Sequence, residues 1–191
     1  MEKTREEIEK EIIEYLDEMS TRKGTPGKGC GLKHGSALVL ATCKDNQPRA
    51  TTLDFFNEGL TLYIFGEPGG KIANIRANPN VSAVVYQPVD HSKTQRYLQI
   101  WGKASLINRK NNKELFEEKV EKWGLYDVAK VLMKGNLKKN GVAENQLDDQ
   151  VNKTVDKALS GMHIIKIEPE KIIMRIFTPD FTGDKHTWTK E

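Results

Sequence analysis

The sequence predicts a single domain of the α+β class, mainly β with flanking helices, over residues 1–191. Short apolar or alternating runs, separated by turn residues, fill residues 36–107 and recur at 162–177, which is typical of antiparallel strands. Apolar residues at three- and four-residue spacing fill residues 4–19 and much of 109–160, which is typical of amphipathic helices. A chain of 191 residues suits one domain with a core of ordinary size.

The composition excludes several classes of protein. Hydrophobic residues make up 37% of the chain and charged residues 30%, as in globular rather than disordered proteins. The net charge is +3, and 30 basic residues are mixed with 27 acidic ones, which argues against a dedicated nucleic-acid binder. No apolar run approaches the roughly 20 residues that span a bilayer. The first residues lack the features of a signal peptide. We therefore expect a cytoplasmic protein with neither nucleic-acid nor membrane partners.

The first predicted element is an amphipathic helix at residues 4–19, packed on the domain. Thr4 and Glu7 have the spacing of a capping box, in which each side chain bonds the backbone of the other. The apolar residues follow at i, i+4, i+7, i+8 and i+11: Ile8, Ile12, Tyr15, Leu16 and Met19.

Residues 20–35 form a basic, glycine-rich loop, which we interpret as a mobile loop beside a ligand site or as a linker. Gly27-Lys28-Gly29 does not form a P-loop, because no Ser or Thr follows the lysine and the segment precedes a strand. Cys30 and His34 have a spacing that a metal could use, but no second pair lies near them, so no metal site is predicted. Cys30 and Cys43 are not a Cys-x-x-Cys pair, and no disulfide framework is implied.

The sheet is predicted to form from short strands joined by turns. Lys44-Asp45-Asn46 joins the first two strands, and a turn at residues 57–59 completes a hairpin with the third. Glu168-Pro169-Glu170 is predicted to be a turn between the last two strands, and the tail after residue 177 is predicted to lie on the surface. The predicted strands are residues 36–43, 48–56, 60–66, 81–86, 96–107, 162–167 and 171–177.

A helical insertion is predicted at residues 109–160, and we expect it to cover one end of the sheet or a subunit contact. The stretch GNLKKNG at residues 135–141 is predicted to separate its last two helices. The apolar residues of these helices are Leu115, Phe116, Val120, Trp123, Val128, Leu132, Met133, Leu147, Val151, Val155 and Leu159.

The candidate binding site is the turn Pro68-Gly69-Gly70 and the short helix that Lys71 opens. Two glycines let several backbone N–H groups converge, and the helix directs the positive end of its dipole to the same point. A lysine at that end is ordinarily unfavourable, which suggests that an anion offsets it. Asn78-Pro79 ends the helix, because the residue before proline leaves the α region. Arg49, at the start of the strand at 48–56, suits bidentate phosphate contacts.

These groups indicate a phosphorylated ligand with an apolar body. Two cations and the backbone donors contribute roughly 3–6 kcal/mol, at about 1.5–3 kcal/mol per charged hydrogen bond. Micromolar affinity requires about 8 kcal/mol, so apolar burial must supply the rest. The alternative left open is a hairpin followed by a capped helical turn with two solvated cations.

Three pieces of the sequence carry a resemblance to a known family. They are the strand pair containing Ala41-Thr42 and Pro48-Arg49, the helix with Lys71, Asn74-Ile75 and Asn78-Pro79, and the strand with Gly102-Lys103-Ala104. In this order they make residues 36–107 resemble the pyridoxamine 5′-phosphate oxidase-like, FMN-binding split β-barrel family. A weaker similarity lies in IIKIEPEKIIMRI.

The resemblance implies a six- or seven-stranded antiparallel split barrel and a homodimer with the flavin site at the subunit interface. It implies that the strand at 48–56 runs along the flavin and that the strand at 96–107 lies beside it across the interface. No catalytic residue is implied. The implied cofactor-binding residues are Arg49, Ala50, Thr51, Thr52, Leu53, Ile64, Phe65, Gly69, Gly70, Lys71, Tyr97 and Gln99.

The sequence departs from the vitamin-synthesising oxidase itself in three places. Asp54 stands where that enzyme has a lysine, Gly69-Gly70 replaces its Ser-Arg, and the tail FTGDKHTWTKE lacks its Arg-Leu-x-Pro ending. We therefore predict an FMN-dependent oxidoreductase of this superfamily that acts on an unidentified small molecule or redox partner, other than the pyridoxine-pathway enzyme.

Three alternatives stay open. One is a non-enzymatic FMN electron carrier, or a flavin- or haem-binding protein on the same barrel. Another replaces FMN by the deazaflavin F420, and the third is a structural barrel without a cofactor. The residues that leave haem open are His34, His91, His163 and His186.

Overall fold

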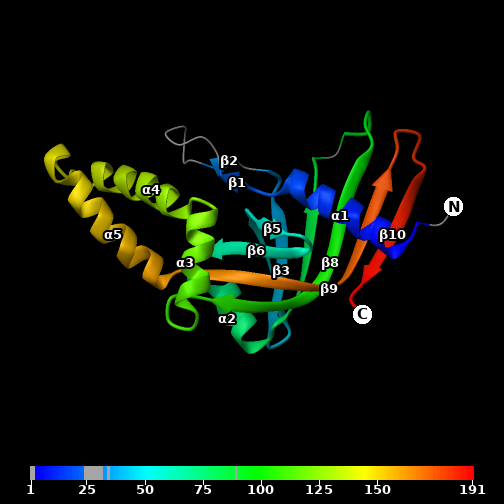
Figure 1. Cartoon of the computed structure of the whole chain (residues 1–191), viewed down its shortest axis with the longest axis horizontal. Coiled ribbons are helices and arrows are strands. Elements are labelled where there is room, and N and C mark those ends of the chain that lie inside the picture. The colour runs from blue at the N-terminus through cyan, green and yellow to red at the C-terminus, as the bar shows by residue number, and fades with distance from the viewer. Residues whose placement is uncertain (1–2, 24–31, 34, 89) are drawn as a thin grey trace.

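A computed structural model describes residues 3–23, 32–33, 35–88 and 90–191. Within these residues, eight antiparallel strands form one sheet in the order β4-β3-β7-β8-β9-β6-β5, with β10 beside β9 (Figure 1). The strands are β3 (Leu38–Lys44), β4 (Gln47–Leu53), β5 (Phe56–Glu58), β6 (Thr61–Gly66), β7 (Asn80–Tyr86), β8 (Gln95–Ile107), β9 (His163–Phe177) and β10 (Gly183–Thr189).

The two longest strands, β8 and β9, organise the sheet. They pair along their whole length, and β6 and β10 share the other edge of β9. β6 occupies its first half, at residues 163–167, and β10 occupies its second half, at residues 171–177. The sheet therefore divides into two parts along one edge, and it curves around the main core (Figure 1).

The helices lie around this sheet. In Figure 1, α1 crosses in front of the strands, α2 lies at the bottom of the view, and α3, α4 and α5 extend to the left. A separate pair of two-residue strands, β1 (Arg22–Lys23) and β2 (Leu32–Lys33), lies within the segment predicted to be a loop. The helices are α1 (Arg5–Met19), α2 (Gly70–Ala77), α3 (Lys113–Lys122), α4 (Leu125–Lys139), the 3-10 turn η1 (Glu144–Gln146) and α5 (Leu147–Gly161).

The predicted first helix is confirmed. Thr4 and Glu7 form the capping box, and the helix buries Ile12, Tyr15, Leu16 and Met19 as the spacing requires. The Tyr15 hydroxyl donates to the carbonyl of Arg96 on β8 at 2.6 Å. This contact ties the helix to the centre of the sheet.

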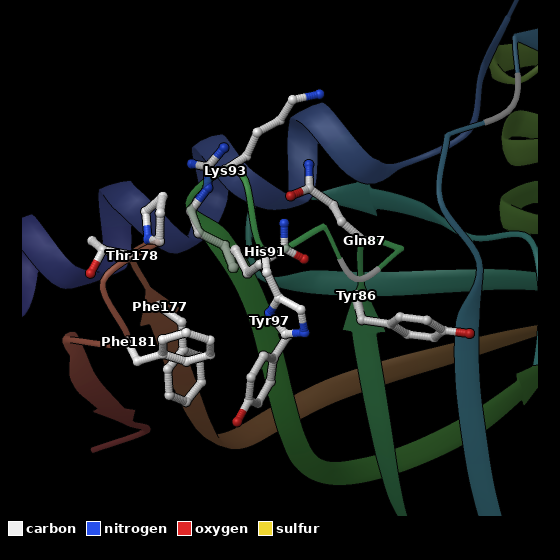
Figure 2. A pocket seen from close by; sticks show the side chains of 11 residues that line it. Tyr86, Gln87, His91, Lys93, Tyr97, Phe177, Thr178 and Phe181 are labelled. Carbon is white, nitrogen blue, oxygen red and sulfur yellow. The ribbon is translucent and has the colours of Figure 1, made fainter.

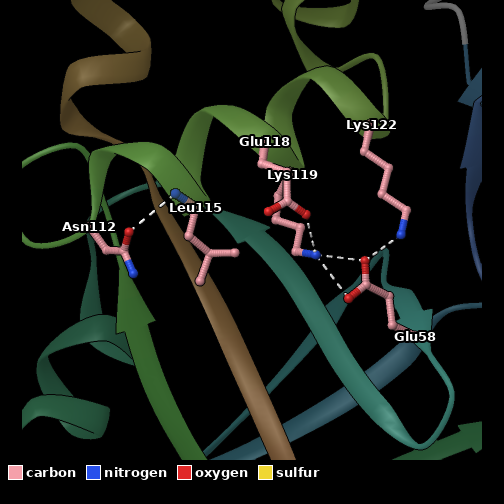
Figure 3. A network of polar contacts seen from close by, with 6 residues as sticks. All are labelled: Glu58, Asn112, Leu115, Glu118, Lys119 and Lys122. Atoms are coloured by element: carbon pink, nitrogen blue, oxygen red, sulfur yellow. Dashed lines mark hydrogen bonds and ion pairs between the residues drawn. The ribbon is translucent and has the colours of Figure 1, made fainter.

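The helical insertion packs on the part of the sheet formed by β5 and β6, and a buried lysine marks the contact. Lys119 on α3 is 5% exposed, and its Nζ lies 2.7 Å from Glu58 Oε1 and 2.9 Å from Glu118 Oε1 (Figure 3). The same Nζ lies 5.3 Å and 5.8 Å from the ring centroids of Tyr63 and Trp123. Two carboxylates and two aromatic faces therefore compensate the buried charge.

The predicted turn at Glu168-Pro169-Glu170 is wrong, because β9 is continuous across it. Proline cannot donate to a strand ladder, so it is tolerated where the ladder is already interrupted. Such an interruption is present, because the register with β8 shifts between Trp101 and Gly102. Gly102 suits this point, since an added Cβ would lie 2.3 Å from the carbonyl oxygen of Glu168.

Two other predicted boundaries in the sheet are also wrong. The strand predicted at 48–56 breaks at Asp54-Phe55 into β4 and β5, which raises the strand count above six or seven. The predicted turn at 57–59 falls instead at Gly59-Leu60, where Gly59 has a φ of 58°. Phe55 is fully buried and its carbonyl accepts from the N–H of Thr21 at 2.7 Å. The strand therefore breaks where Phe55 enters the core and its backbone carbonyl pairs outside the sheet.

The segment GNLKKNG does not separate two helices, because α4 runs through Gly135 to Lys139. The helix ends at Lys139, and Gly141, which follows the C-cap residue Asn140, has a φ of 80°. The N–H groups of Gly141 and Val142 donate to the carbonyls of Lys138 and Leu137, the pattern of a Schellman motif. Only the second glycine of the segment therefore ends the helix.

The tail contains a strand, β10, which was not predicted, although most of its residues are exposed as expected for a surface segment. β10 pairs with β9 over seven residues, and Trp188 is 6% exposed. The indole N–H of Trp188 donates to Glu9 on α1 at 2.7 Å. The chain's last strand is thus fixed between the sheet and the first helix.

No helix within the described residues has the length and apolar character needed to cross a membrane.

Candidate functional site

The site is built on β4, the strand at one end of the sheet order. Within the described residues β4 pairs only with β3, so its other edge is open. The hairpin turn between them is Asp45-Asn46, and both residues have positive φ, 51° and 57°. Two such residues make a tight turn that matches the strand twist and fixes the register. Arg49 therefore lies directly opposite Thr42 of β3.

The helix α2 is held against the same part of β3. Ile72 and Ile75 are buried in the main core, and the Asn74 side chain donates to Thr42 Oγ1 at 3.1 Å. Asn78 ends the helix as predicted, with its N–H donating to the Asn74 carbonyl at 2.8 Å. These contacts fix the amino end of α2 beside β4.

The structure brings Arg49 and Gly70 together. A Cβ added to Gly70 would lie 2.9 Å from Arg49 Nη1 and 3.2 Å from Arg49 Cζ. The guanidinium group therefore occupies the space that a side chain at Gly70 would need. The sequence analysis expected both residues at one phosphate site, and the structure brings them together.

The second cation of the predicted site is placed in the same way. A Cβ added to Gly66 would lie 3.0 Å from Lys71 Cε and 3.7 Å from Lys71 Nζ. The lysine side chain thus folds back over the end of β6, toward the turn. We call Arg49, Gly66, Gly69, Gly70 and Lys71 together the glycine cradle.

The amino end of α2 carries no side-chain cap. Gly69 is the N-cap residue, and the first turn contains no acidic residue. An added Cβ at Gly69 would meet nothing within 4 Å, so the space beside it is open. Within the described residues, neither Arg49 nor Lys71 takes part in an ion pair or a side-chain hydrogen bond. Uncapped helix amides beside two unpaired cations make a site suited to an anion.

The other predicted residues of β4 divide between the two faces of the sheet. Thr51 and Leu53 share the face of Arg49, and Ala50 and Thr52 lie on the outer face. Asp54 follows the far end of the strand, five residues from Arg49, which is about 16 Å of extended chain. Its charge is therefore remote from the glycine cradle.

Tyr97 and Gln99 lie on the outer face of β8, but the fold separates them from β4. Gln99 is opposite Val84 of β7. Val84 is in turn opposite Val39 of β3, and Val39 is opposite Thr52 of β4. Three strand spacings of about 4.8 Å place Gln99 about 14 Å from Thr52. One chain alone does not bring them to the same ligand.

Two predicted residues of β6 point elsewhere. Ile64 is 0% exposed within the main core, so its side chain cannot reach a ligand on the surface. Phe65 packs against α3, with its ring centroid 6.2 Å from that of Phe116. The β6 residue that lies at the cradle is Gly66, which sequence reasoning missed. The only sequence signal for Gly66 is that it is a glycine five residues before Lys71.

A second missed contact anchors the other end of α2. His163 at the start of β9 is 8% exposed, and its Nε2 lies 2.9 Å from Arg76 Nη2. Burial, and then the charge of Arg76, lower the pKa of His163 from its ordinary 6.5. The neutral ring accepts a hydrogen bond from the guanidinium. A lone histidine gave no sequence signal for this pairing.

The three histidines that the structure describes lie apart from one another. His91 contacts Phe181, His163 contacts Arg76, and His186 lies near Lys3. Gly27-Lys28-Gly29, Cys30 and His34 lie outside the described residues.

Comparison with sequences places most of the chain in one family. Residues 31–175 match the family model described as pyridoxamine 5′-phosphate oxidase. General stress protein 26 of Bacillus subtilis is 29% identical over 94 residues, which are 48% of this chain and 66% of that protein. An uncharacterized protein of Rhizobium meliloti is 42% identical over 48 residues, 25% of this chain and 32% of that protein. The two alignments thus span just under two thirds of the first relative and about a third of the second.

Comparison with solved structures shows the same fold at low identity. A Listeria innocua protein provisionally named a pyridoxamine 5′-phosphate oxidase has a TM-score of 0.53 at 21% identity, covering 87% of this chain and 96% of its own. An FAD-binding protein from Mesorhizobium loti has a TM-score of 0.51 at 18% identity, covering 75% and 88%. At these identities the likeness concerns the split-barrel fold.

Proposed function

Because the chain belongs to the pyridoxamine 5′-phosphate oxidase family, we propose that it is a flavoprotein that binds FMN at the glycine cradle and oxidises or reduces a small molecule. The observation that carries the proposal is the placement of Arg49 over Gly70 and of Lys71 over Gly66, beside an uncapped helix end. The flavin-binding Mesorhizobium loti protein of the same fold supports a flavin as the ligand.

The cradle suits a terminal phosphate. A phosphate group presents oxygens to several donors at once, and the first-turn amides of α2 have no side-chain partner. The Arg49 fork can bond two oxygens, whereas Lys71 contributes a point charge. Each such charged hydrogen bond is worth about 1.5–3 kcal/mol. FMN ends in a single phosphate, so one anion site of this kind is what it requires.

The open edge of β4 is the proposed place for the flavin ring. Residues 50–53 continue from Arg49 along an edge whose backbone N–H and C=O groups are not paired to a further strand among the described residues. A flat heterocycle with donors and acceptors on its rim can pair with such an edge, as an added strand does. Ala50, Thr51, Thr52 and Leu53 are therefore the proposed ring contacts.

A homodimer would complete this site. The outer face of the sheet carries apolar side chains that are only partly covered, among them Val39, Val84 and Trp101, the last 41% exposed. Patches of this kind mark interfaces. Since Gln99 and Tyr97 lie too far from β4 within one chain, we propose that a second copy supplies them to the ring.

The chemistry itself would come from FMN, which accepts and gives electrons when bound. The chain's own contributions are to hold the phosphate with the cradle, to align the ring along β4 and to exclude water by dimerisation. No side chain is assigned as a general acid or base.

The pyridoxine pathway is not the proposed role. In the pyridoxine-pathway enzyme the tail helps to hold the substrate. In this chain the tail contains the strand β10, which pairs with β9 and is fixed to α1 through Trp188. A segment fixed in this way is not free to close over a substrate at the cradle.

The first experiment is an absorbance spectrum of the purified protein, which we expect to show flavin and to release FMN on denaturation. The double variant Arg49→Ala, Lys71→Ala should lose the cofactor. Lys44→Ala is a matched control, because Lys44 lies on β3 beside the hairpin turn and pairs only weakly with Asp45, at 3.8 Å. If the double variant keeps as much flavin as the control, the cradle does not bind it. Rapid reduction of bound flavin by NADH or NADPH would mark an enzyme, and slow reduction would favour an electron carrier.

A further inference from the structure

The fold places a buried histidine beside the glycine cradle. His163, the first residue of β9, lies directly opposite Gly66, the last residue of β6 and a member of the cradle. Directly opposed residues of an antiparallel pair project from the same face of the sheet, with Cβ atoms about 4.5–5.5 Å apart. Lys71 fills the space over Gly66 on that face, with its Nζ 3.7 Å from the position of an added Cβ. His163 and Lys71 are therefore neighbours on one face of the sheet.

A third cationic group reaches the same place from the other end of α2. Arg76 is in the last turn of the helix, and its Nη2 lies 2.9 Å from His163 Nε2. The helix thus directs both of its cations, Lys71 and Arg76, at the residue pair formed by Gly66 and His163. Within the described residues neither cation takes part in an ion pair, and Glu67, in the turn after β6, is exposed and unpaired. The described part of the chain supplies no counter-charge to this cluster.

The other charged groups near this end of β9 compensate one another. Arg109, which follows β8, pairs with Glu117 at 2.6 Å and with Asp156 at 2.7 Å. The residues at 161–162, which lead into β9, are uncharged. The ring of His163 is 8% exposed, and burial, followed by the adjacent guanidinium, lowers its pKa from 6.5. Uncompensated charge at this ring is therefore positive.

An anion in the cradle reverses that balance. A dianion held by Lys71 and the first-turn amides of α2 brings negative charge to the side of Gly66, and nearby negative charge favours the protonated form of an imidazole. Coupling of this kind is reciprocal: a proton on His163 strengthens anion binding by the factor by which the anion strengthens proton binding. Anion and proton are thus bound together.

The helix remains in place when the histidine is protonated. The protonated ring no longer accepts from Arg76, and that contact is lost. Ile72 and Ile75 stay buried in the main core, and the Asn74 side chain still donates to Thr42 Oγ1 at 3.1 Å. The charge on the ring, rather than a movement of α2, therefore decides the direction of the effect.

We propose that His163 links cofactor binding to pH: a proton on its ring and a phosphate dianion in the glycine cradle stabilise each other, so the anion is held more tightly as pH falls below neutrality. The inference rests on the anion site of the proposed function and adds a means of regulating it. It requires no open surface on the outer face of the sheet, because His163 is buried at the end of β9.

The test is calorimetric titration of the cofactor-free protein with sodium sulfate at several values between about pH 5 and 7.5. Sulfate keeps both of its negative charges across this range, so a change in its affinity reports the protein. We expect the affinity to rise about threefold toward the acidic end, because one added charge acts on the dianion through partly screened surroundings. His163→Gln should show no such rise, because the glutamine oxygen can accept from Arg76 but binds no proton.

His91→Gln is the matched control. Figure 2 shows His91 at a pocket beside Tyr97 and Phe181, between the β7–β8 loop and the β9–β10 turn. His91 precedes β8, whereas His163 lies past the other end of that 13-residue strand. The His91 side chain is exposed, so its titration is remote from the cradle and should leave the wild-type profile unchanged.

The outcomes separate this inference from the proposed function. A rise in sulfate affinity in the wild type and in His91→Gln, with a flat profile in His163→Gln, supports the linkage. The same slope in His163→Gln as in the wild type, or an affinity that falls with pH, would overturn the inference and leave the FMN site standing. Equal sulfate binding by the wild type and by Arg49→Ala, Lys71→Ala would overturn the cradle and the linkage together.

Discussion

The guanidinium of Arg49 lies where a side chain at Gly70 would have to be, 2.9 Å from the position of an added Cβ. The two residues are 21 positions apart in the sequence and come from different elements, a sheet edge and a helix start. Their contact is the physical basis of the proposed anion site.

Gly70→Ala tests that contact without disturbing the fold. The added methyl displaces the end of a flexible side chain rather than backbone, and alanine is about 1 kcal/mol better than glycine in a helix. We expect FMN to bind about tenfold more weakly while the thermal unfolding midpoint stays the same or rises. Gly135→Ala is the control, because Gly135 lies on α4 outside the cradle and an added Cβ there meets nothing within 4 Å. Equal FMN affinity in both variants would remove Arg49 from the site.

Several parts of this arrangement could be predicted from sequence because their causes are local. The capping box of α1, the Asp45-Asn46 turn and the end of α2 at Asn78-Pro79 depend on residues within a few positions of each other. The glycine turn and the two cations were identified for the same reason.

The parts that sequence could not predict depend on distant partners. Pro169 fits a continuous strand only because β8 shifts its register at Gly102. Trp188 becomes buried because α1 and β9 lie beside it. The cavity beside Tyr97 is lined by residues from 86–97 and from 177–181, which are distant in the sequence, so no local pattern could indicate it.

The pairing of His163 with Arg76 predicts a specific dependence of stability on pH. The folded pKa of His163 lies below its ordinary 6.5, so the unfolded chain takes up the proton first as pH falls. The free energy of unfolding should therefore decrease as pH falls below about 6.5, and the decrease should stop once pH is below the lowered folded pKa. Above about pH 6.5 the titration of His163 should not change stability. His163→Gln should flatten the profile in chemical denaturation between about pH 5 and 7. His91→Gln, on an exposed loop, should keep the wild-type slope, and a wild-type slope in His163→Gln would contradict the assignment.

The buried Lys119 should matter for stability rather than for cofactor binding. Removing it in Lys119→Ala leaves Glu58, whose side chain is 28% exposed, without one of its two cations. We expect a loss of about 2 kcal/mol, below the 3–5 kcal/mol typical of a fully buried pair, because Lys122 still lies 2.6 Å from Glu58. Lys122→Ala should cost less than about 1 kcal/mol, since that side chain is 52% exposed. Urea unfolding measures both, and equal losses would show that burial of Lys119 contributes nothing.

The central claim is tested most directly by titrating cofactor-free protein with FMN and with riboflavin, which carries the same ring without the phosphate. If the glycine cradle holds a phosphate through Arg49, Lys71 and the first-turn amides of α2, FMN should bind about 100-fold more tightly, a difference of about 2.7 kcal/mol. Equal affinity for the two compounds, or binding of neither, would contradict the account.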